Sequence, residues 1–254
     1  MTFHKAIIIF FAGMVGAVMN ALAGGGTFIG FPTLLFTGIP PISANVTNNM
    51  AMLMGSIASG TAYRDRLDVS KRILIPLLIA SICGGLTGAL LLLRTPAHAF
   101  MRVIPWFLLV ATLLFTFGKR LANIRHLNVS HEASVRAILT TSFLIFTVTI
   151  YGGYFGAGMS IIVLAMLAAA GMADIHAMNA LKSLIVIAVN SIAALYFSIS
   201  GAVYWPQAAV MSAGAIIGGY FGAHFAKRLP QIWVRAFVIV VGSGTTIYFF
   251  IKTY

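Results

Sequence analysis

The chain has 254 residues, of which 60% are hydrophobic and only 8% are charged, and its mean hydropathy is +1.01. It carries 16 Lys and Arg against four acids, a net charge of +12 at pH 7. A soluble domain of this length needs more charged residues than this to cover its surface. The composition therefore predicts an all-α polytopic membrane protein. The basic excess is typical of loops that anchor helices at the cytoplasmic face, not of nucleic-acid binding.

Ten apolar runs follow one another along the chain. Most are close to the roughly 20 residues needed to cross the hydrocarbon core of a bilayer. The two runs that are too short each follow a glycine cluster, so we predict them as returning limbs of glycine-broken, hairpin-like segments. Such backbone is tolerated at membrane depth only where it is buried in protein or lines a cavity. The runs cover residues 5–22, 27–37 (short), 44–63, 73–93, 98–118, 134–152, 159–170 (short), 175–198, 204–225 and 231–251.

The first run imitates a signal peptide, since Lys5 precedes it and Ala21-Leu22-Ala23 ends it. We expect it to be kept as a helix, because the Gly24 region resembles a second-half region that keeps its upstream helix.

The two halves of the chain match at offsets of 132 to 134 residues, which indicates an internal duplication. We predict one membrane transport domain, 1–254, with repeats at about 5–118 and 134–252 and a linker at 119–133. Each repeat would hold one glycine-broken segment and three full transmembrane helices. Gly24, Gly26, Gly84, Gly85 and Gly88 align with Gly156, Gly158, Gly218, Gly219 and Gly222.

The distribution of basic residues favours an inverted arrangement of the repeats. If each broken segment returns to its own side, eleven Lys and Arg residues fall on one side and four on the other. The positive-inside rule then makes the linker cytoplasmic and both termini extracytoplasmic, in the cytoplasmic (inner) membrane. The four are Lys5, Arg94, Arg102 and Lys252.

Lys182 lies about seven residues, on the order of 10 Å, inside its predicted helix. An isolated charge at that depth costs several kcal/mol, so we expect it to bind a small anionic substrate. The alternative is that Lys182 reaches the interface or satisfies a carbonyl.

Amide side chains follow helical spacing on one face of two helices, and on the second helix Lys182 lies at the edge of that face. Their N–H groups are suitable donors to oxyanions, although each could simply bond another helix. Free backbone N–H groups beside the glycine clusters would add to the site. The predicted substrate-binding residues are Lys182, Asn48, Asn49, Asn179, Asn190, Gly25, Gly26, Thr27, Gly156, Gly158 and Ser160.

Asp174 and His176, which precede Lys182, are weaker candidates for a functional role. Asp174 is predicted to cap the 175–198 helix, as Ser43 caps the 44–63 helix, and a ligand role is the less favoured alternative. His176 is a candidate for gating or proton transfer, with a structural role as the alternative.

Catalytic and cofactor patterns are missing from the sequence. No glycine-rich segment carries the Lys-Ser/Thr of a P-loop, and His126 and His131 lack metal-ligand partners. No nucleophile–His arrangement can be argued, and the single Cys83 excludes an internal disulfide. We expect no enzymatic activity, no cofactor and no metal.

Nearly the whole chain resembles the sulfite exporter TauE/SafE family of membrane transporters. The resemblance rests on three stretches of sequence, although no proline follows Gly158 at the place that Pro32 takes in the first half. The family implies export of sulfite or small organosulfonates across the cytoplasmic membrane. The stretches are Gly24-Gly25-Gly26 with Pro32, Gly38 and Pro40; Tyr151-Gly152-Gly153-Tyr154-Phe155-Gly156-Ala157-Gly158 with Gly171, Asp174, His176 and Asn179-Ala180-Leu181-Lys182; and Gly218-Gly219-Tyr220-Phe221-Gly222-Ala223.

The sequence therefore predicts a secondary transporter that exports a small sulfur oxyanion, sulfite or an organosulfonate, by alternating access. A passive anion channel, an uptake transporter for thiosulfate or a small carboxylate, and a membrane enzyme or sensor subunit are the alternatives. The lipid bilayer is an expected partner and nucleic acid is not. The oligomeric state is open, with a homodimer as one possibility.

Overall fold

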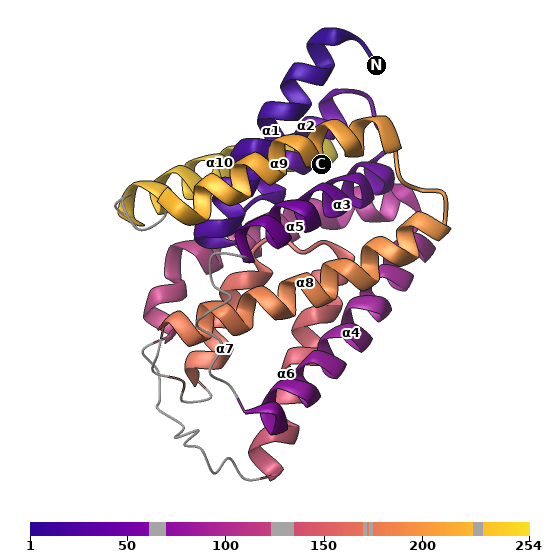
Figure 1. Cartoon of the computed structure of the whole chain (residues 1–254). Helices are drawn as coiled ribbons and strands as arrows, with labels where there is room; N and C mark the ends of the chain where they lie inside the picture. Colours follow the sequence, from indigo (N-terminus) through magenta and orange to yellow (C-terminus); the bar gives the residue numbers. More distant parts are fainter. Residues whose placement is uncertain (61–69, 123–134, 170–171, 173–174, 226–230) are drawn as a thin grey trace.

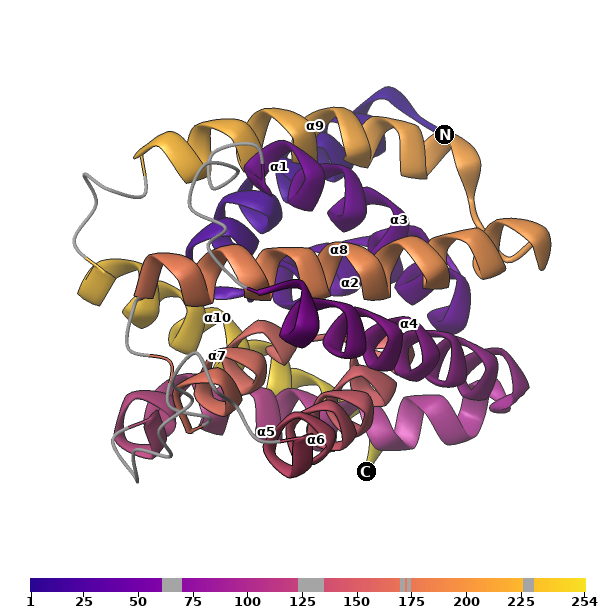
Figure 2. The same cartoon turned by 60° about the horizontal axis from the view of Figure 1, so that its bottom comes forward.

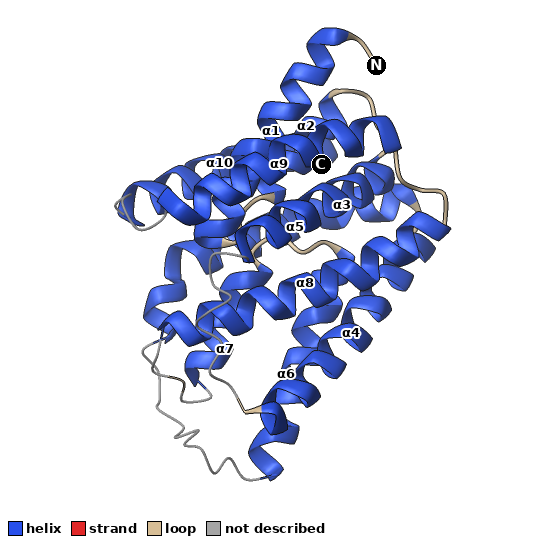
Figure 3. Ribbon diagram, in the orientation of Figure 1, coloured by secondary structure: helices blue, strands red, loops and turns tan. Residues whose placement is uncertain are grey.

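The described part of the chain contains helices joined by short loops and no strand (Figures 1 and 3). The computed structural model describes all residues except 61–69, 123–134, 170–171, 173–174 and 226–230, and at some further helical positions it describes only the backbone. Within these limits there are ten helices and no strand. They are α1 (Phe3–Ala23), α2 (Thr27–Phe36), α3 (Pro41–Gly60), α4 (Lys71–Arg94), α5 (Ala97–Ala122), α6 (Val135–Tyr154), α7 (Met159–Ala169), α8 (Ile175–Ile199), α9 (Trp205–Phe225) and α10 (Gln231–Thr253).

Each predicted apolar run corresponds to one of these helices, so the prediction of an all-α membrane fold is confirmed. One predicted boundary is wrong. Ser43 was expected to cap the third run, but α3 begins at Pro41, and Ser43 lies inside its first turn. Proline is favoured at the first helical position, since its fixed φ suits the helix and its missing N–H has no partner there in any case.

Among the described residues, five helices are long and apolar enough to cross a membrane. The spans are Phe3–Leu22, Lys71–Arg94, Ala97–Leu114, Ala177–Ile199 and Ala236–Thr253. α3 has 20 residues but is not among them, because Asn45, Thr47, Asn48 and Asn49 lower its hydropathy. The protein is thus a multi-pass membrane protein with a polar helix near its centre.

The two short helices turn back from the chain breaks. α2 packs on α1, and α7 packs on α6. The Lys5 Nζ at the start of α1 donates a hydrogen bond to the Thr37 carbonyl oxygen at the end of α2, at 2.8 Å, so both limbs reach the same end of the molecule. In Figure 1, α1 descends from the N-terminus at the top, whereas α6 rises from the bottom. The two broken segments therefore enter the molecule from opposite ends.

Helices of one half pack between helices of the other. α4 packs along α6 and α8, and α9 packs along α1 and α3. If α1–α5 are matched in order with α6–α10, the contact of α4 with α6 corresponds to that of α9 with α1, and the contact of α4 with α8 to that of α9 with α3. Two similar halves related by a two-fold axis would show this correspondence. The duplication itself stays a prediction.

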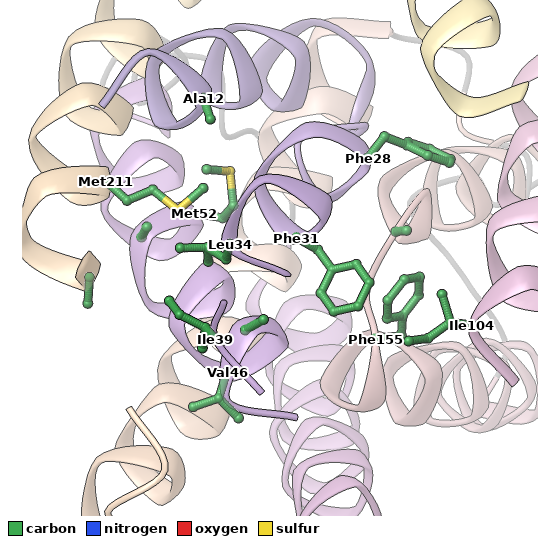
Figure 4. Close-up of a cluster of buried hydrophobic side chains, with 14 of the residues drawn as sticks. Ala12, Phe28, Phe31, Leu34, Ile39, Val46, Met52, Ile104, Phe155 and Met211 are labelled. Carbon is green, nitrogen blue, oxygen red and sulfur yellow. The ribbon is translucent and has the colours of Figure 1, made fainter. Parts of the chain in front are cut away.

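The buried core surrounds the first broken segment. Phe31 of α2 lies edge-on to Phe155, with ring centroids 5.5 Å apart, and also contacts Phe100. Figure 4 shows Phe31 and Phe155 facing each other, with Met52 and Met211 on the other side of α2. These large side chains hold α2 rigidly within the molecule, because protein interiors are close-packed.

Candidate functional site

The first break lies between α1 and α2. Gly24 has φ +79, and its N–H donates to the carbonyl oxygens of Asn20 and Met19, which ends α1 as a left-handed cap. A Cβ on Gly24 would collide with the side chain of Ser160 on α7. Glycine is therefore required here both for the backbone conformation and for the approach of the other half.

The second break lies between α6 and α7. Gly156 has φ +78, Gly158 has φ +75, and the Tyr151 hydroxyl donates to the Ala157 carbonyl oxygen at 2.6 Å. The Gly158 N–H then donates to the Gly24 carbonyl oxygen at 3.3 Å. This hydrogen bond joins the two breaks, so the first turns of α2 and α7 begin side by side in the interior.

Asparagines of α3 and α8 surround the joined breaks. The Asn49 Nδ2 donates to the Asn190 Oδ1 at 3.2 Å, which links the two helices directly. The Asn48 Nδ2 donates to the Thr27 Oγ1 at 3.4 Å, and the Asn45 Nδ2 donates to the Tyr154 carbonyl oxygen at 2.9 Å. The amides of α3 thus contact both breaks as well as α8.

These groups line one small pocket with a cavity volume of about 20 Å³. None of the described residues that line it is charged. Thr27 at the start of α2 and Met159 and Ser160 at the start of α7 lie in its lining, so the positive dipole ends of both helices are close to it. The lining residues are Asn20, Thr27, Asn48, Asn49, Met52, Phe155, Gly156, Met159, Ser160, Val186 and Asn190.

The amide groups of the pocket have unused hydrogen-bonding capacity. The Oδ1 atoms of Asn48 and Asn49 are buried and have no hydrogen-bond partner among the described residues. Rotation of an amide about its last side-chain bond exchanges the oxygen with two N–H donors. The pocket can therefore offer neutral donors, hydroxyl groups and helix N-termini to a small polar or anionic ligand.

Lys182 is not among the residues that line this pocket. It is buried, with 5% of its surface exposed, and its Nζ donates to the Asn179 Oδ1 at 3.2 Å. It lies one helical turn from Val186 and two from Asn190, both of which line the pocket. The structure thus gives Lys182 and Asn179 a place next to the amide pocket and separate from it.

The other predicted residues divide into three groups. Thr27, Gly156 and Ser160 line the pocket, as do three of the four predicted asparagines. Gly25, Gly26 and Gly158 are buried at the breaks without lining it. Asp174 and the side chain of His176 lie outside the described residues.

Asn20 was missed by the sequence analysis. It lines the pocket, and its Nδ2 donates to the Ser56 Oγ at 3.0 Å. The sequence did contain a signal for Asn20, because it is a lone amide in an apolar helix and lies four residues before a glycine cluster. Phe155 and Met159 also line the pocket and were not predicted, because an apolar residue at a chain break does not by itself indicate a binding site.

Within the described residues, no group of three or more His, Cys, Asp or Glu side chains is close enough to hold a metal ion.

Comparison with known proteins gives consistent results. The family model described as sulfite exporter TauE/SafE matches residues 9–249. The chain is 30% identical to a probable membrane transporter protein of Haemophilus influenzae over 247 residues, which cover 94% of this chain and 92% of that protein. It is 26% identical to the probable membrane transporter protein ORF9 of Sinorhizobium sp, covering 97% of this chain and 93% of that protein. It is 27% identical to the probable membrane transporter protein YfcA of Escherichia coli K12, covering 93% and 86%. No solved structure matches the chain.

The matched region includes both broken segments and the pocket between them, and the relatives that align over nearly their whole length are named as membrane transporters. The protein belongs to the sulfite exporter TauE/SafE family of membrane transporters.

Proposed function

We propose that this protein is a secondary transporter that exports a small sulfur oxyanion, sulfite or an organosulfonate, across the cytoplasmic membrane by alternating access. The observation that carries the proposal is the hydrogen bond between Gly158 and Gly24. It brings two helix starts into one buried pocket beside the linked amides of Asn49 and Asn190. Broken helices whose N-terminal ends point at a central site are a known way for transporters to bind anionic groups.

The narrowness of the pocket and the large apolar side chains in its wall support a transporter rather than a continuous channel. Little of its empty space is wide enough for water, and Met52, Phe155 and Met159 lie in its wall. A site enclosed in this way suits a cycle in which one half moves against the other to open each side in turn. The family description supports sulfite as the first substrate to test.

Each predicted binding group has a role in this proposal. Asn48, Asn49 and Asn190 donate to the oxyanion together with the Thr27 and Ser160 hydroxyls and the backbone around Gly25, Gly26, Gly156 and Gly158. Lys182, beside Asn179, supplies the positive charge. Asp174 is the proposed cap of the 175–198 helix, and His176 is the candidate for a proton-linked step.

The test is sulfite flux in proteoliposomes with Asn190→Ala and a matched control on the same helix, Ser198→Ala. Asn190→Ala removes the partner of the Asn49 Nδ2, so we expect flux to fall about tenfold or more, in line with the cost of an unsatisfied buried polar group. The Ser198 Oγ donates to the Ala194 carbonyl oxygen of its own helix, and Ser198 does not line the pocket, so Ser198→Ala should keep wild-type flux.

Three outcomes contradict the proposal in whole or in part. Equal flux in both variants would mean that the pocket does not bind the substrate. Wild-type flux that always follows the electrochemical gradient, with no accumulation under an imposed ion gradient, would identify a passive channel instead. Uptake of thiosulfate or a carboxylate in preference to sulfite would replace the substrate and direction but keep the site.

A further inference from the structure

A second pocket lies away from the two breaks, where the first turns of α1 and α9 meet the end of α2. Its cavity volume is about 310 Å³, which is enough for a small ligand or a headgroup. The proposed transport cycle does not use this pocket. It is lined by Met1, Thr2, Lys5, Ile9, Thr37 and Gln207.

The two long helices beside this pocket run in the same direction. A Cβ on Gly214 would meet the backbone of Phe10, and a Cβ on Gly218 would meet the backbone of Met14. Both helices advance by four residues between these contacts, so they are parallel and their N-terminal ends lie at the same end of the molecule. Figure 2 shows the N-terminus of the chain beside the first turn of α9. Two positive helix-dipole ends therefore meet at the pocket, which favours an anion there.

Lys5, the third residue of α1, adds a positive charge to the lining. Its Nζ donates one hydrogen bond, to the Thr37 carbonyl oxygen at 2.8 Å. An ammonium has three N–H donors, and the other two have no partner among the described residues. The bond to Thr37 places the ammonium between the start of α1 and the end of α2, where it can bind an anion in the pocket.

Gln207, the third residue of α9, contributes the opposite wall. Its Oε1 is buried and has no hydrogen-bond partner among the described residues. An unpaired buried polar atom costs about 1–3 kcal/mol, so a ligand that brings an O–H or N–H donor to this oxygen is favoured. The pocket therefore fits a ligand that carries an anionic group and a nearby hydrogen-bond donor.

The pocket lies at the level where a bilayer places its headgroups. The membrane-spanning stretch of α1 begins at Phe3, between two lining residues of the pocket. Tyr204 and Trp205 are exposed at the start of α9, and Tyr and Trp are enriched at the membrane–water interface. The buried side chain of Ile9 gives the pocket an apolar wall. At this level the phosphate of a phospholipid is the anion that the surroundings supply in abundance.

We propose that this pocket binds the phosphate of a phospholipid whose headgroup carries a hydroxyl or ammonium donor. The Lys5 ammonium and the two helix ends bind the phosphate oxygens, and the Gln207 Oε1 accepts a hydrogen bond from the headgroup. The bound lipid joins α1 and α2 to α9, which lies in the other half of the chain. This site is separate from the amide pocket, and it does not depend on the proposed function.

The experiment measures lipid binding to the purified full chain in detergent by native mass spectrometry. Phosphatidylglycerol and phosphatidylcholine both carry a phosphate, but only phosphatidylglycerol has headgroup hydroxyls. We expect the wild type to bind phosphatidylglycerol about threefold or more tightly than phosphatidylcholine, in line with one net hydrogen bond.

Three variants identify the site. Lys5→Gln should weaken the binding of both lipids about fivefold or more, because it removes a charge-assisted bond to the phosphate. Gln207→Leu should weaken only phosphatidylglycerol, to the level of phosphatidylcholine. Lys252→Gln is the matched control, because Lys252 is exposed, carries the same charge and does not line the pocket. It should bind both lipids as the wild type does.

The outcomes test each part of the inference. Equal binding by Lys5→Gln and Lys252→Gln overturns the site, and a loss of both lipids or of neither in Gln207→Leu overturns the role of the headgroup donor. If Lys5→Gln does not fold, the selective loss in Gln207→Leu decides, and its absence overturns the inference. Displacement of phosphatidylglycerol by an equal concentration of inorganic phosphate or sulfite would show a site for free anions and overturn the lipid assignment. No step measures flux, so failure of sulfite transport would defeat the proposed function and leave this result unchanged.

Discussion

At the scale of single residues, the site depends on glycines at which no other residue fits. Gly24 combines a left-handed backbone, φ +79, with direct contact to Ser160 of the opposite half. Gly38 has a similar backbone, φ +96, but a Cβ there would meet nothing within 4 Å. A comparison of substitutions at Gly24 and Gly38 therefore distinguishes the effect of backbone strain, which both positions share, from the effect of the contact between the breaks, which only Gly24 makes.

We predict that Gly24→Ala is clearly more destabilising than Gly38→Ala. Both substitutions impose the left-handed penalty of about 1–2 kcal/mol on a residue with a Cβ. Only Gly24→Ala also drives the first turn of α7 away from the first break, so only this variant should lose sulfite flux. Thermal unfolding of the two purified variants in detergent measures the difference, and equal unfolding temperatures would argue against a tight junction of the breaks.

At the scale of helices, close packing depends on glycines where the two halves meet. A Cβ on Gly88 of α4 would collide with the Ile150 carbonyl oxygen of α6, and one on Gly218 of α9 would collide with the Met14 carbonyl oxygen of α1. Small residues allow membrane helices to approach this closely. At both interfaces, glycine therefore permits the close approach of the two helices.

We expect Gly88→Ala and Gly218→Ala each to destabilise the protein by about 1–3 kcal/mol, the usual cost of overpacking. Gly244→Ala on α10 is the matched control, because a Cβ there meets nothing within 4 Å. It should be neutral or stabilising by about 0.5–1 kcal/mol, since alanine favours helix over glycine. Detergent-solubilised unfolding curves give the comparison, and a destabilised Gly244→Ala would remove the packing explanation.

At the scale of the whole molecule, the two broken segments enter from opposite ends and the helices of each half pack between those of the other (Figures 1 and 2). This is the packing expected of two inverted repeats. The orientation in the membrane stays a prediction from the distribution of Lys and Arg along the sequence, and labelling can test it.

We predict that both termini are extracytoplasmic and that the linker is cytoplasmic. In a Cys83→Ala background, Thr2→Cys and Tyr254→Cys, both at exposed positions, should react with a membrane-impermeant maleimide in intact cells. Ser130→Cys, in the linker outside the described residues, should react only after permeabilisation. The reverse pattern would invert the predicted topology.

The sequence alone determined the helices and most of the pocket. Apolar runs near the length of a bilayer crossing specify helices, because lipid satisfies no backbone hydrogen bond. Asparagines at helical spacing had to face inward for the same reason, and three of them do line the pocket with Thr27, Gly156 and Ser160. The glycine clusters located both breaks.

Only the tertiary structure decided which of these groups share one space. The junction of the breaks through Gly158 and Gly24 joins residues 134 positions apart, and the Asn49–Asn190 link spans 141 positions. Such contacts depend on how α3 and α8 cross, and helical periodicity gives the face of a residue but not its depth relative to another helix. For that reason the sequence predicted a single site with Lys182 inside it, whereas the fold leaves the ammonium beside Asn179, about two turns of α8 away from Asn190.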